Sequence, residues 1–130
     1  MGPPEARPLV LDAGALIAVE RADREVLALI AVAVDAEQPV VVPAGVIGQV
    51  WRDGAQRARV ARIIHAQGTT IERLDLPTAK AAGVLCGLAR TSDVIDATVV
   101  IAARAVNALV ITSDPNDLRL LDPAIDTHRA

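Results

Sequence analysis

Aromatic side chains are almost absent from this chain of 130 residues. Trp51 is the only one, because the sequence contains no Phe and no Tyr. The chain therefore has almost no aromatic ring on which a base could stack, which excludes RNA-binding modules built on an aromatic platform. We interpret Trp51 itself as a core or dimer-interface residue.

Cysteine is equally scarce, and basic residues do not outnumber acids. Cys86 is the only cysteine, so neither an intramolecular disulfide nor a Cys-based zinc cage can form. The formal net charge is −3, from 13 Lys+Arg and 16 Asp+Glu, so the field of the whole molecule does not attract nucleic acid. A nucleic-acid role would need a local basic patch or a bound cation.

Long apolar runs are missing as well. The longest uncharged run compatible with a helix, residues 26–34, is about half of the roughly 20 residues that a membrane span needs. It is apolar all round, which indicates a deeply buried segment or an interface. The first residues, MGPPEARP, lack the basic-then-apolar order of a secretory signal. We therefore expect a cytoplasmic location and no membrane partner.

What the chain does have is enough apolar side chain for a core, since 52% of its residues are hydrophobic, and we predict a single domain over residues 1–130. Short apolar runs predict strands at residues 9–11, 39–43 and 108–112. Alternating polar and apolar residues predict another at 69–74, and a weak fifth strand is predicted near residues 125–128. Segments with helical character lie between them, at residues 15–21, 25–36, 45–51, 56–66, 78–90 and 93–106. This alternation predicts an α/β fold, a three-layer α/β/α sandwich with a central parallel sheet of four to five strands.

Aspartates follow the strands of the predicted sheet. Asp12 directly follows the first strand, Asp114 follows the fourth, and Asp117 comes three residues later. The carboxyl ends of parallel strands meet at one edge of a sheet, where such folds bind ligands, so we expect these side chains to collect there. Each also has a local alternative: Asp12 as a helix N-cap, Asp114 in an Asp-Pro turn and Asp117 as an acid of a first helical turn.

Two more aspartates begin the helical segment that precedes the fourth strand. Asp93 and Asp96 are three residues apart, which places them on one face of a helix, and we expect Thr91 or Ser92 to cap it. Asp93 can also be a first-turn acid favoured by the helix dipole. Asp96 is the lone acid within an apolar helical run, which favours a functional role.

Carboxylates gathered in one crevice repel one another, so one or more must hold a proton unless a cation neutralises them. Mg²⁺ and Mn²⁺ prefer carboxylate oxygen and water, whereas zinc prefers His or Cys. His65, His128 and Cys86 do not cluster near the aspartates in the sequence, and we interpret all three as structural. An all-carboxylate magnesium site is typical of phosphate chemistry.

Four segments of the chain, in order, resemble the PIN-domain family of Mg²⁺-dependent nucleases, and more closely its VapC-type toxins of bacterial toxin–antitoxin pairs. The segments are LVLDAGALIAVE, VVPAGVIGQVWRDG, TSDVIDATVVIAA and VITSDPNDL. The resemblance spans nearly the whole chain. It implies a parallel α/β/α sandwich, a homodimer, an acidic site for Mg²⁺, and endoribonuclease action on tRNA, rRNA or mRNA that a cognate antitoxin protein holds in check.

The resemblance also assigns roles to single residues. Asp12 matches the family's first aspartate, Asp96 the aspartate of its DA-rich helix, and Asp114 the aspartate of its T-x-D motif. Asp93 matches an extra acid that is common in the subgroup. These four aspartates are therefore the implied metal-binding and catalytic residues.

Gln49 departs from the family pattern, which usually has a glutamate at this point. A glutamine can coordinate through its carbonyl oxygen, but it removes a negative charge and should weaken metal binding. Asp53, four residues later on the same helical face, is a candidate substitute. We expect five residues to contact the metal ligands and hold them in place: Gln49, Asp53, Asp117, Thr112 and Ser113.

Four arginines fall within eleven residues of the chain: Arg52, Arg57, Arg59 and Arg62. They are candidates for a cationic strip that contacts RNA phosphates, which an otherwise acidic protein lacks. The alternative is a solvated helix face.

Three functions compete on these observations. The first is a Mg²⁺-dependent endoribonuclease; the second is a PIN-like RNA- or antitoxin-binding module with an impaired site, for which Gln49 is the support. The third is another α/β phosphate protein. A haloacid-dehalogenase-like phosphatase needs a second Asp where this chain has Gly14, and a response-regulator receiver needs a lysine after its last main strand, whereas Lys80 precedes it.

Overall fold

The computed structural model describes residues 6–51 and 57–130, and its centre is a parallel sheet of five strands in the order β3-β2-β1-β4-β5. The strands are β1 (Leu9–Leu11), β2 (Val40–Pro43), β3 (Thr69–Glu72), β4 (Leu109–Thr112) and β5 (Thr127–Arg129). All four neighbouring pairs are parallel. The predicted α/β fold with a central parallel sheet is confirmed, and the weak fifth strand is present.

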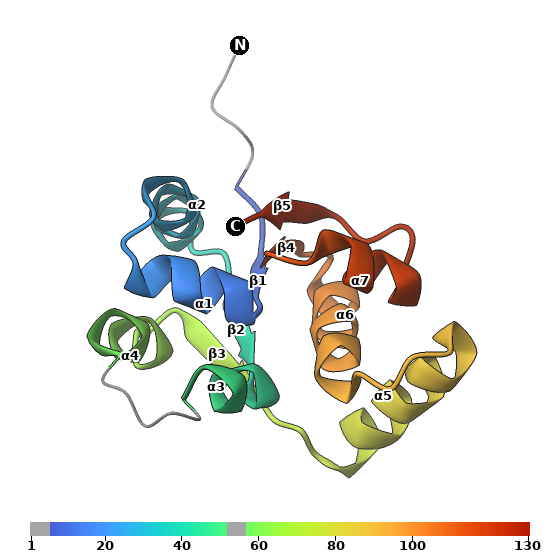
Figure 1. Ribbon diagram of the computed structural model, residues 1–130. Coiled ribbons are helices and arrows are strands. Elements are labelled where there is room, and N and C mark those ends of the chain that lie inside the picture. The colour runs from blue at the N-terminus through green and yellow to red at the C-terminus, as the bar shows by residue number, and fades with distance from the viewer. Residues whose placement is uncertain (1–5, 52–56) are drawn as a thin grey trace.

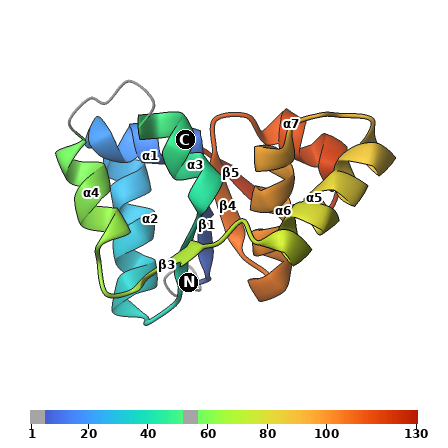
Figure 2. The ribbon, with the colours of Figure 1, turned by 90° about the horizontal axis from the view of Figure 1, so that it is seen from below.

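Helices cover both faces of this sheet (Figures 1 and 2). They are α1 (Ala13–Glu20), α2 (Arg24–Asp35), α3 (Ala44–Trp51), α4 (Ala58–Ile64), α5 (Leu76–Ala89), α6 (Val94–Val106) and α7 (Pro115–Leu121). The first layer contains α1, α2 and α4, and the opposite layer contains α5, α6 and α7 (Figure 1). Helix α3 directly follows β2 and contacts both α1 and α6, so it bridges the layers at the carboxyl edge of the sheet.

The core lies on both sides of the three central strands. Every residue of β1 and β2 is buried, as expected for parallel strands with helices on both faces. The edge strand β3 instead alternates half-buried and exposed residues. The central strands therefore hold the ends of their loops on a rigid support.

Helix α2 shows how the apolar run at residues 26–34 is used. Val26, Ile30 and Ala33 are buried in the core, whereas Val32 and Val34 are exposed. The run is thus only half buried. Of the two alternatives predicted for it, deep burial is wrong for the run as a whole, and the exposed apolar side chains leave the interface with another chain as a prediction. No helix within residues 6–51 and 57–130 combines the length and apolarity that crossing a membrane requires.

Two glycines allow close packing at the carboxyl edge of the sheet, where α1, α3 and α6 have their N-termini. A Cβ on Gly14, in α1, would lie 2.3 Å from Oγ of Ser113, which follows β4. A Cβ on Gly45, in α3, would lie 2.3 Å from Cδ1 of Ile95 in α6. Such distances are far inside van der Waals contact, so the absence of a side chain lets α1 pack against the segment after β4 and α3 pack against α6.

Candidate metal site

A pocket of about 370 Å³ lies at this edge, where the three helix N-termini meet the ends of β1 and β4. Its charged and polar lining residues are Asp12, Gln49, Asp93, Asp96, Ser113, Asp114 and Asp117. No Lys, Arg or His is among the described residues that line it. The structure therefore brings the four aspartates predicted as metal ligands into one pocket, which we call the acid pocket.

Asp12 is the most buried of these carboxylates, with 7% of its surface exposed. It is the N-cap of α1, where its Oδ1 accepts a hydrogen bond from the Ala15 backbone N–H at 3.1 Å. Burial raises the pKa of Asp12, against the opposing effect of hydrogen bonds from the Thr112 hydroxyl and the backbone. The capping role and a place in the acid pocket are therefore compatible.

Asp93 is the N-cap of α6, and it accepts a hydrogen bond from the Asp96 backbone N–H at 3.0 Å. The expected cap at Thr91 or Ser92 is wrong by one or two residues. Thr91 instead accepts a hydrogen bond from the Asp93 backbone N–H at 3.4 Å. Asp and Ser are about equally good N-caps, so local preference does not decide between them; in the structure the Asp93 carboxylate accepts the capping hydrogen bond, and the helix begins after it.

Asp96 carries the clearest electrostatic signature in the acid pocket. Its pKa is raised to about 7, first because the side chain is partly buried and then because Asp93, Asp117, Asp12 and Asp114 repel its charge. Repulsion from several carboxylates at once is the condition under which a bound cation is most favourable. The lone acid of the apolar helix thus lies where its sequence context indicated.

Asp114 and its neighbours form the side of the acid pocket that follows β4. The Thr112 hydroxyl accepts a hydrogen bond from the Asp114 backbone N–H at 2.9 Å, and the Ser113 hydroxyl donates to Asp114 Oδ2 at 3.4 Å. Asp114 occupies the N-cap position of α7 without a side-chain capping bond. Because Thr112 is fully buried and also hydrogen-bonds to the Asp12 carboxylate, its hydroxyl holds the Asp12 carboxylate and the Asp114 backbone at the end of β4.

Two further predicted residues also line the acid pocket. Gln49 is an exposed residue of α3, and Asp117 lies in the first turn of α7. Helix α7 itself is not evident from the sequence, because its seven residues are too few to show a helical period; Pro115 at its start is a favourable first residue. Asp53 and Arg52 lie outside the described residues.

The donor set of the acid pocket suits a hard cation. Five carboxylates, one amide and one hydroxyl offer oxygen alone, as Mg²⁺ prefers. Within residues 6–51 and 57–130, no group of three or more His, Cys, Asp and Glu side chains is already arranged around a single point that could hold an ion. The fit to Mg²⁺ rests on the oxygen donors of these residues and on the pocket that they share.

The histidines and the cysteine contribute nothing to this lining. His128 pairs with Glu25 at 3.1 Å, and buried Cys86 lies 3.4 Å from the Asp93 carbonyl oxygen through its Sγ. His65 is the C-cap residue of α4. Their positions agree with the structural interpretation and leave no zinc-type ligand in the pocket.

The arginines of the predicted strip lie outside the acid pocket. Arg57, Arg59 and Arg62 belong to α4 and its start, and none lines the pocket. Arg59 is used to join helices: its Nη1 donates to the Glu20 carbonyl oxygen at 3.0 Å, while the Glu20 carboxylate accepts from the backbone N–H groups of Arg59 and Val60. Glu20 thus caps α4 from a distance of 39 residues along the chain, which no local sequence signal indicates.

Comparison with known proteins gives structural matches only. No protein-family model matches the chain, and no curated protein matches it. VapBC2 from Rickettsia felis, solved bound to a DNA fragment from their promoter, is similar with a TM-score of 0.70 at 10% identity, over 95% of this chain and 98% of that chain.

Two further structures agree with that match. FitAB bound to the IR36 DNA fragment gives a TM-score of 0.61 at 14% identity, over 93% of this chain and 94% of that one. FitAcB from Neisseria gonorrhoeae gives a TM-score of 0.60 at 15% identity, over 92% and 95%. At such identities the likeness establishes the fold, and this chain has the PIN-like fold that its four sequence segments resemble.

Proposed function

We propose that this protein is a Mg²⁺-dependent endoribonuclease and the toxin of a toxin–antitoxin pair. The observation that carries the proposal is the acid pocket, where five aspartates meet at the carboxyl edge of a PIN-like sheet without a base among the described lining residues. A site with this excess of negative charge stores unfavourable electrostatic energy that a divalent cation relieves. Carboxylate-bound Mg²⁺ is in turn typical of phosphoryl chemistry.

Four residues would hold the ion: Asp12, Asp93, Asp96 and Asp114. When bound, Mg²⁺ would supply a nucleophilic water and stabilise the charge that develops on the scissile phosphodiester. Asp12 is oriented by the Ala15 N–H and the Thr112 hydroxyl. Asp96 holds a proton up to about pH 7 in the cation-free site, so binding of a divalent ion releases this proton and should tighten as the pH rises.

The partners of the proposed toxin are its RNA substrate (tRNA, rRNA or mRNA), a cognate antitoxin and a second copy of the chain, in the cytoplasm. The VapBC2 and FitAB structures, solved on DNA, support an assembly that includes an antitoxin. Helix α5 supports the homodimer, because Leu76, Val84 and Leu88 are 67%, 65% and 80% exposed on it. Apolar side chains gathered on one exposed helix are typical of a protein interface.

Cleavage of RNA by the antitoxin-free protein tests the proposal. We expect defined fragments in Mg²⁺, no fragments in EDTA, and no fragments from Asp96→Asn, which keeps the size of the side chain but not its charge. Asp35→Asn, at the last residue of α2, is the matched control and should cleave like the wild type. Equal cleavage by wild type and Asp96→Asn would contradict the assignment of the site.

The second candidate is an RNA- or antitoxin-binding module with an impaired site, and Gln49 in the lining of the acid pocket favours it. Gln49→Glu separates the two. A large gain in Mg²⁺ affinity and cleavage would indicate that the wild-type site is impaired. Little change would indicate that the site works with an amide at this position.

A further inference from the structure

A second pocket, also of about 370 Å³, adjoins the acid pocket along α1. Gly14, Ile17 and Ser113 line both pockets, so the two pockets adjoin at these residues, and we call them together the α1 groove. Its far end is lined by Ala18, Arg21, Asp23 and Ala130. The α1 groove therefore leads from the acid pocket to the C-terminal end of α1.

The excess of negative charge in the acid pocket ends along the α1 groove. Among the described residues, five aspartates and no base line the acid pocket, whereas the far end has one base, Arg21, which directly follows α1, and one acid, Asp23. No ion pair joins Arg21 to another residue of ranges 6–51 and 57–130. The neighbouring Asp23 is engaged as the N-cap of α2, where it accepts a hydrogen bond from the Val26 N–H at 3.0 Å. The far end of the groove thus offers an exposed guanidinium.

Helix α1 fixes the spacing of the two ends. Asp12 precedes this helix of eight residues and Arg21 follows it, so at 1.5 Å per residue the two lie about 13 Å apart along the axis. Ile17, 37% exposed, lies between them and lines the middle of the α1 groove. The groove therefore presents carboxylates, an apolar middle and a guanidinium in that order, over a length that fits a short stretch of an extended strand.

We propose that Arg21 binds a backbone phosphate of single-stranded RNA whose scissile phosphate lies at the acid pocket. The inference rests on the proposed function and adds to it the path of the substrate strand. A guanidinium binds a phosphate through two parallel hydrogen bonds, and the single-stranded path suits the apolar middle, which a sugar or base can cover. Arg21 supplies in the groove the cationic contact that the net charge of −3 does not provide.

Binding of a fluorescein-labelled single-stranded RNA of 12 nucleotides and mixed sequence, followed by anisotropy in CaCl₂, tests Arg21. A gel verifies that the RNA stays uncut. At about 0.1 M salt, where the Debye length is about 10 Å, Arg21→Gln should raise the Kd about 5- to 10-fold. In a salt series it should reduce the slope of log K against log salt by about 0.7, the value for one phosphate contact to a single strand. Arg21→Lys should keep the slope. Arg24→Gln removes an equal charge three residues away, outside the lining of the α1 groove, and should change the Kd less than about 2-fold.

Cleavage kinetics in Mg²⁺ and thermal unfolding separate a phosphate contact from a structural role. A contact made equally in the ground and transition states raises KM and leaves kcat within about 2-fold. If Arg21 only stabilises the C-terminal end of the α1 dipole, Arg21→Gln would lower Tm and leave RNA binding unchanged. That outcome overturns the inference, and so does equal weakening by Arg21→Gln and Arg24→Gln.

The failure of this inference is distinguishable from that of the proposed function. If the wild type neither binds nor cleaves RNA, both fail. If the wild type binds and cleaves RNA but Arg21→Gln behaves identically, the Arg21 contact alone is overturned, and Arg21 becomes a candidate contact for the antitoxin instead.

Discussion

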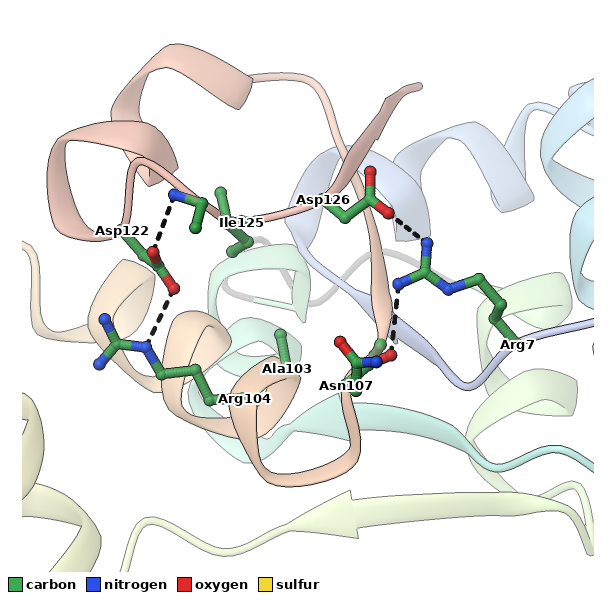
Figure 3. A pocket seen from close by; sticks show the side chains of 9 residues that line it. Arg7, Ala103, Arg104, Asn107, Asp122, Ile125 and Asp126 are labelled. Carbon is green, nitrogen blue, oxygen red and sulfur yellow. Dashed lines mark hydrogen bonds and ion pairs between the residues drawn. The ribbon is translucent and has the colours of Figure 1, made fainter.

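The two ends of the parallel sheet handle charge in opposite ways. At the amino end, a smaller pocket of about 210 Å³ contains two bases and two acids, and they are paired (Figure 3). Arg104 Nε donates to Asp122 at 3.0 Å, and Arg7 pairs with Asp126 while donating to the Asn107 carbonyl oxygen at 3.3 Å. At the carboxyl end, five aspartates share a pocket without a base among the described residues.

The charges at the two ends therefore differ in what they do. Paired charges at the amino end stabilise the fold, whereas like charges at the carboxyl end repel one another. Each pair in Figure 3 joins an arginine to an aspartate of the segment between α7 and β5, and so fastens this segment to the rest of the fold. Arg7 lies just before β1, and Arg104 lies in the last turn of α6. The acid pocket does the reverse, because the raised pKa values of Asp12 and Asp96 mean that their ionised forms are less favourable in the fold than in water. Unrelieved like charge held by a rigid support is a feature expected of functional sites.

Removing one carboxylate from the acid pocket should have the largest effect. Asp12→Asn keeps a good N-cap for α1 and removes a proposed metal ligand, so we expect RNA cleavage to fall by at least about 100-fold. Initial rates of RNA cleavage in Mg²⁺ measure this. An Asp12→Asn variant that unfolds at the wild-type temperature and cleaves at the wild-type rate would contradict the role of the acid pocket in cleavage.

Filling the contact at Gly14 should disturb the carboxyl end through packing alone. Gly14→Ala places a Cβ within 2.3 Å of the Ser113 Oγ and 2.8 Å of its backbone N, so α1 must shift and the free energy of unfolding should fall by about 1–3 kcal/mol. Urea unfolding measures the loss. Gly83→Ala, on α5 with nothing within 4 Å of the new Cβ, is the matched control and should be neutral or stabilising.

The acid pocket should make the metal-free protein less stable as the pH rises. The folded pKa of Asp96, about 7 against a model value of 3.8, means that the folded state binds this proton more tightly than the unfolded chain. The contribution of the Asp96 proton to the free energy of unfolding is therefore complete below about pH 4 and is lost progressively as the pH rises to about 7.

Because Asp96 is partly exposed, we expect a loss of about 1–2 kcal/mol between pH 5 and pH 8, well below the full value of the shift. Urea unfolding in EDTA at both pH values measures it. Asp96→Asn should flatten this dependence, and Mg²⁺ should restore stability to the wild type at pH 8. A wild type that gains stability from pH 5 to pH 8 would contradict the electrostatic account.

Breaking a pair at the amino end should have the smallest effect. Asp122→Asn removes the ion pair with exposed Arg104 and should cost less than about 1 kcal/mol of unfolding free energy. Cleavage of RNA should not change, because this pair lies at the opposite end of the sheet from the acid pocket. A loss of activity comparable to that of Asp12→Asn would show that the two ends do not differ in the way described here.

The features that the sequence predicts are those set by neighbouring residues. The apolar run of β1 and the position of Asp12 after it are local signals, and the parallel sheet then places Asp114 at the same edge. Other features depend on residues far apart in the chain. They are the cap that Glu20 forms on α4, the close contacts of Gly14 with Ser113 and of Gly45 with Ile95, and the pocket beside Arg21. The predicted cap of α6 was wrong for a different reason, since three adjacent residues are all good N-caps and local preference cannot rank them.

The two capping aspartates give the acid pocket an unequal tolerance of sequence drift. Asp12 and Asp93 each begin a helix as well as line the pocket, whereas Asp96 lies inside α6 and caps nothing. A lineage that no longer needed cleavage would be expected to lose Asp96 first and to change Asp12 and Asp93 only to Asn, Ser or Thr, which still cap a helix. The pattern of substitutions at these three positions would therefore record whether a descendant of this protein had been selected for its chemistry or only for its fold.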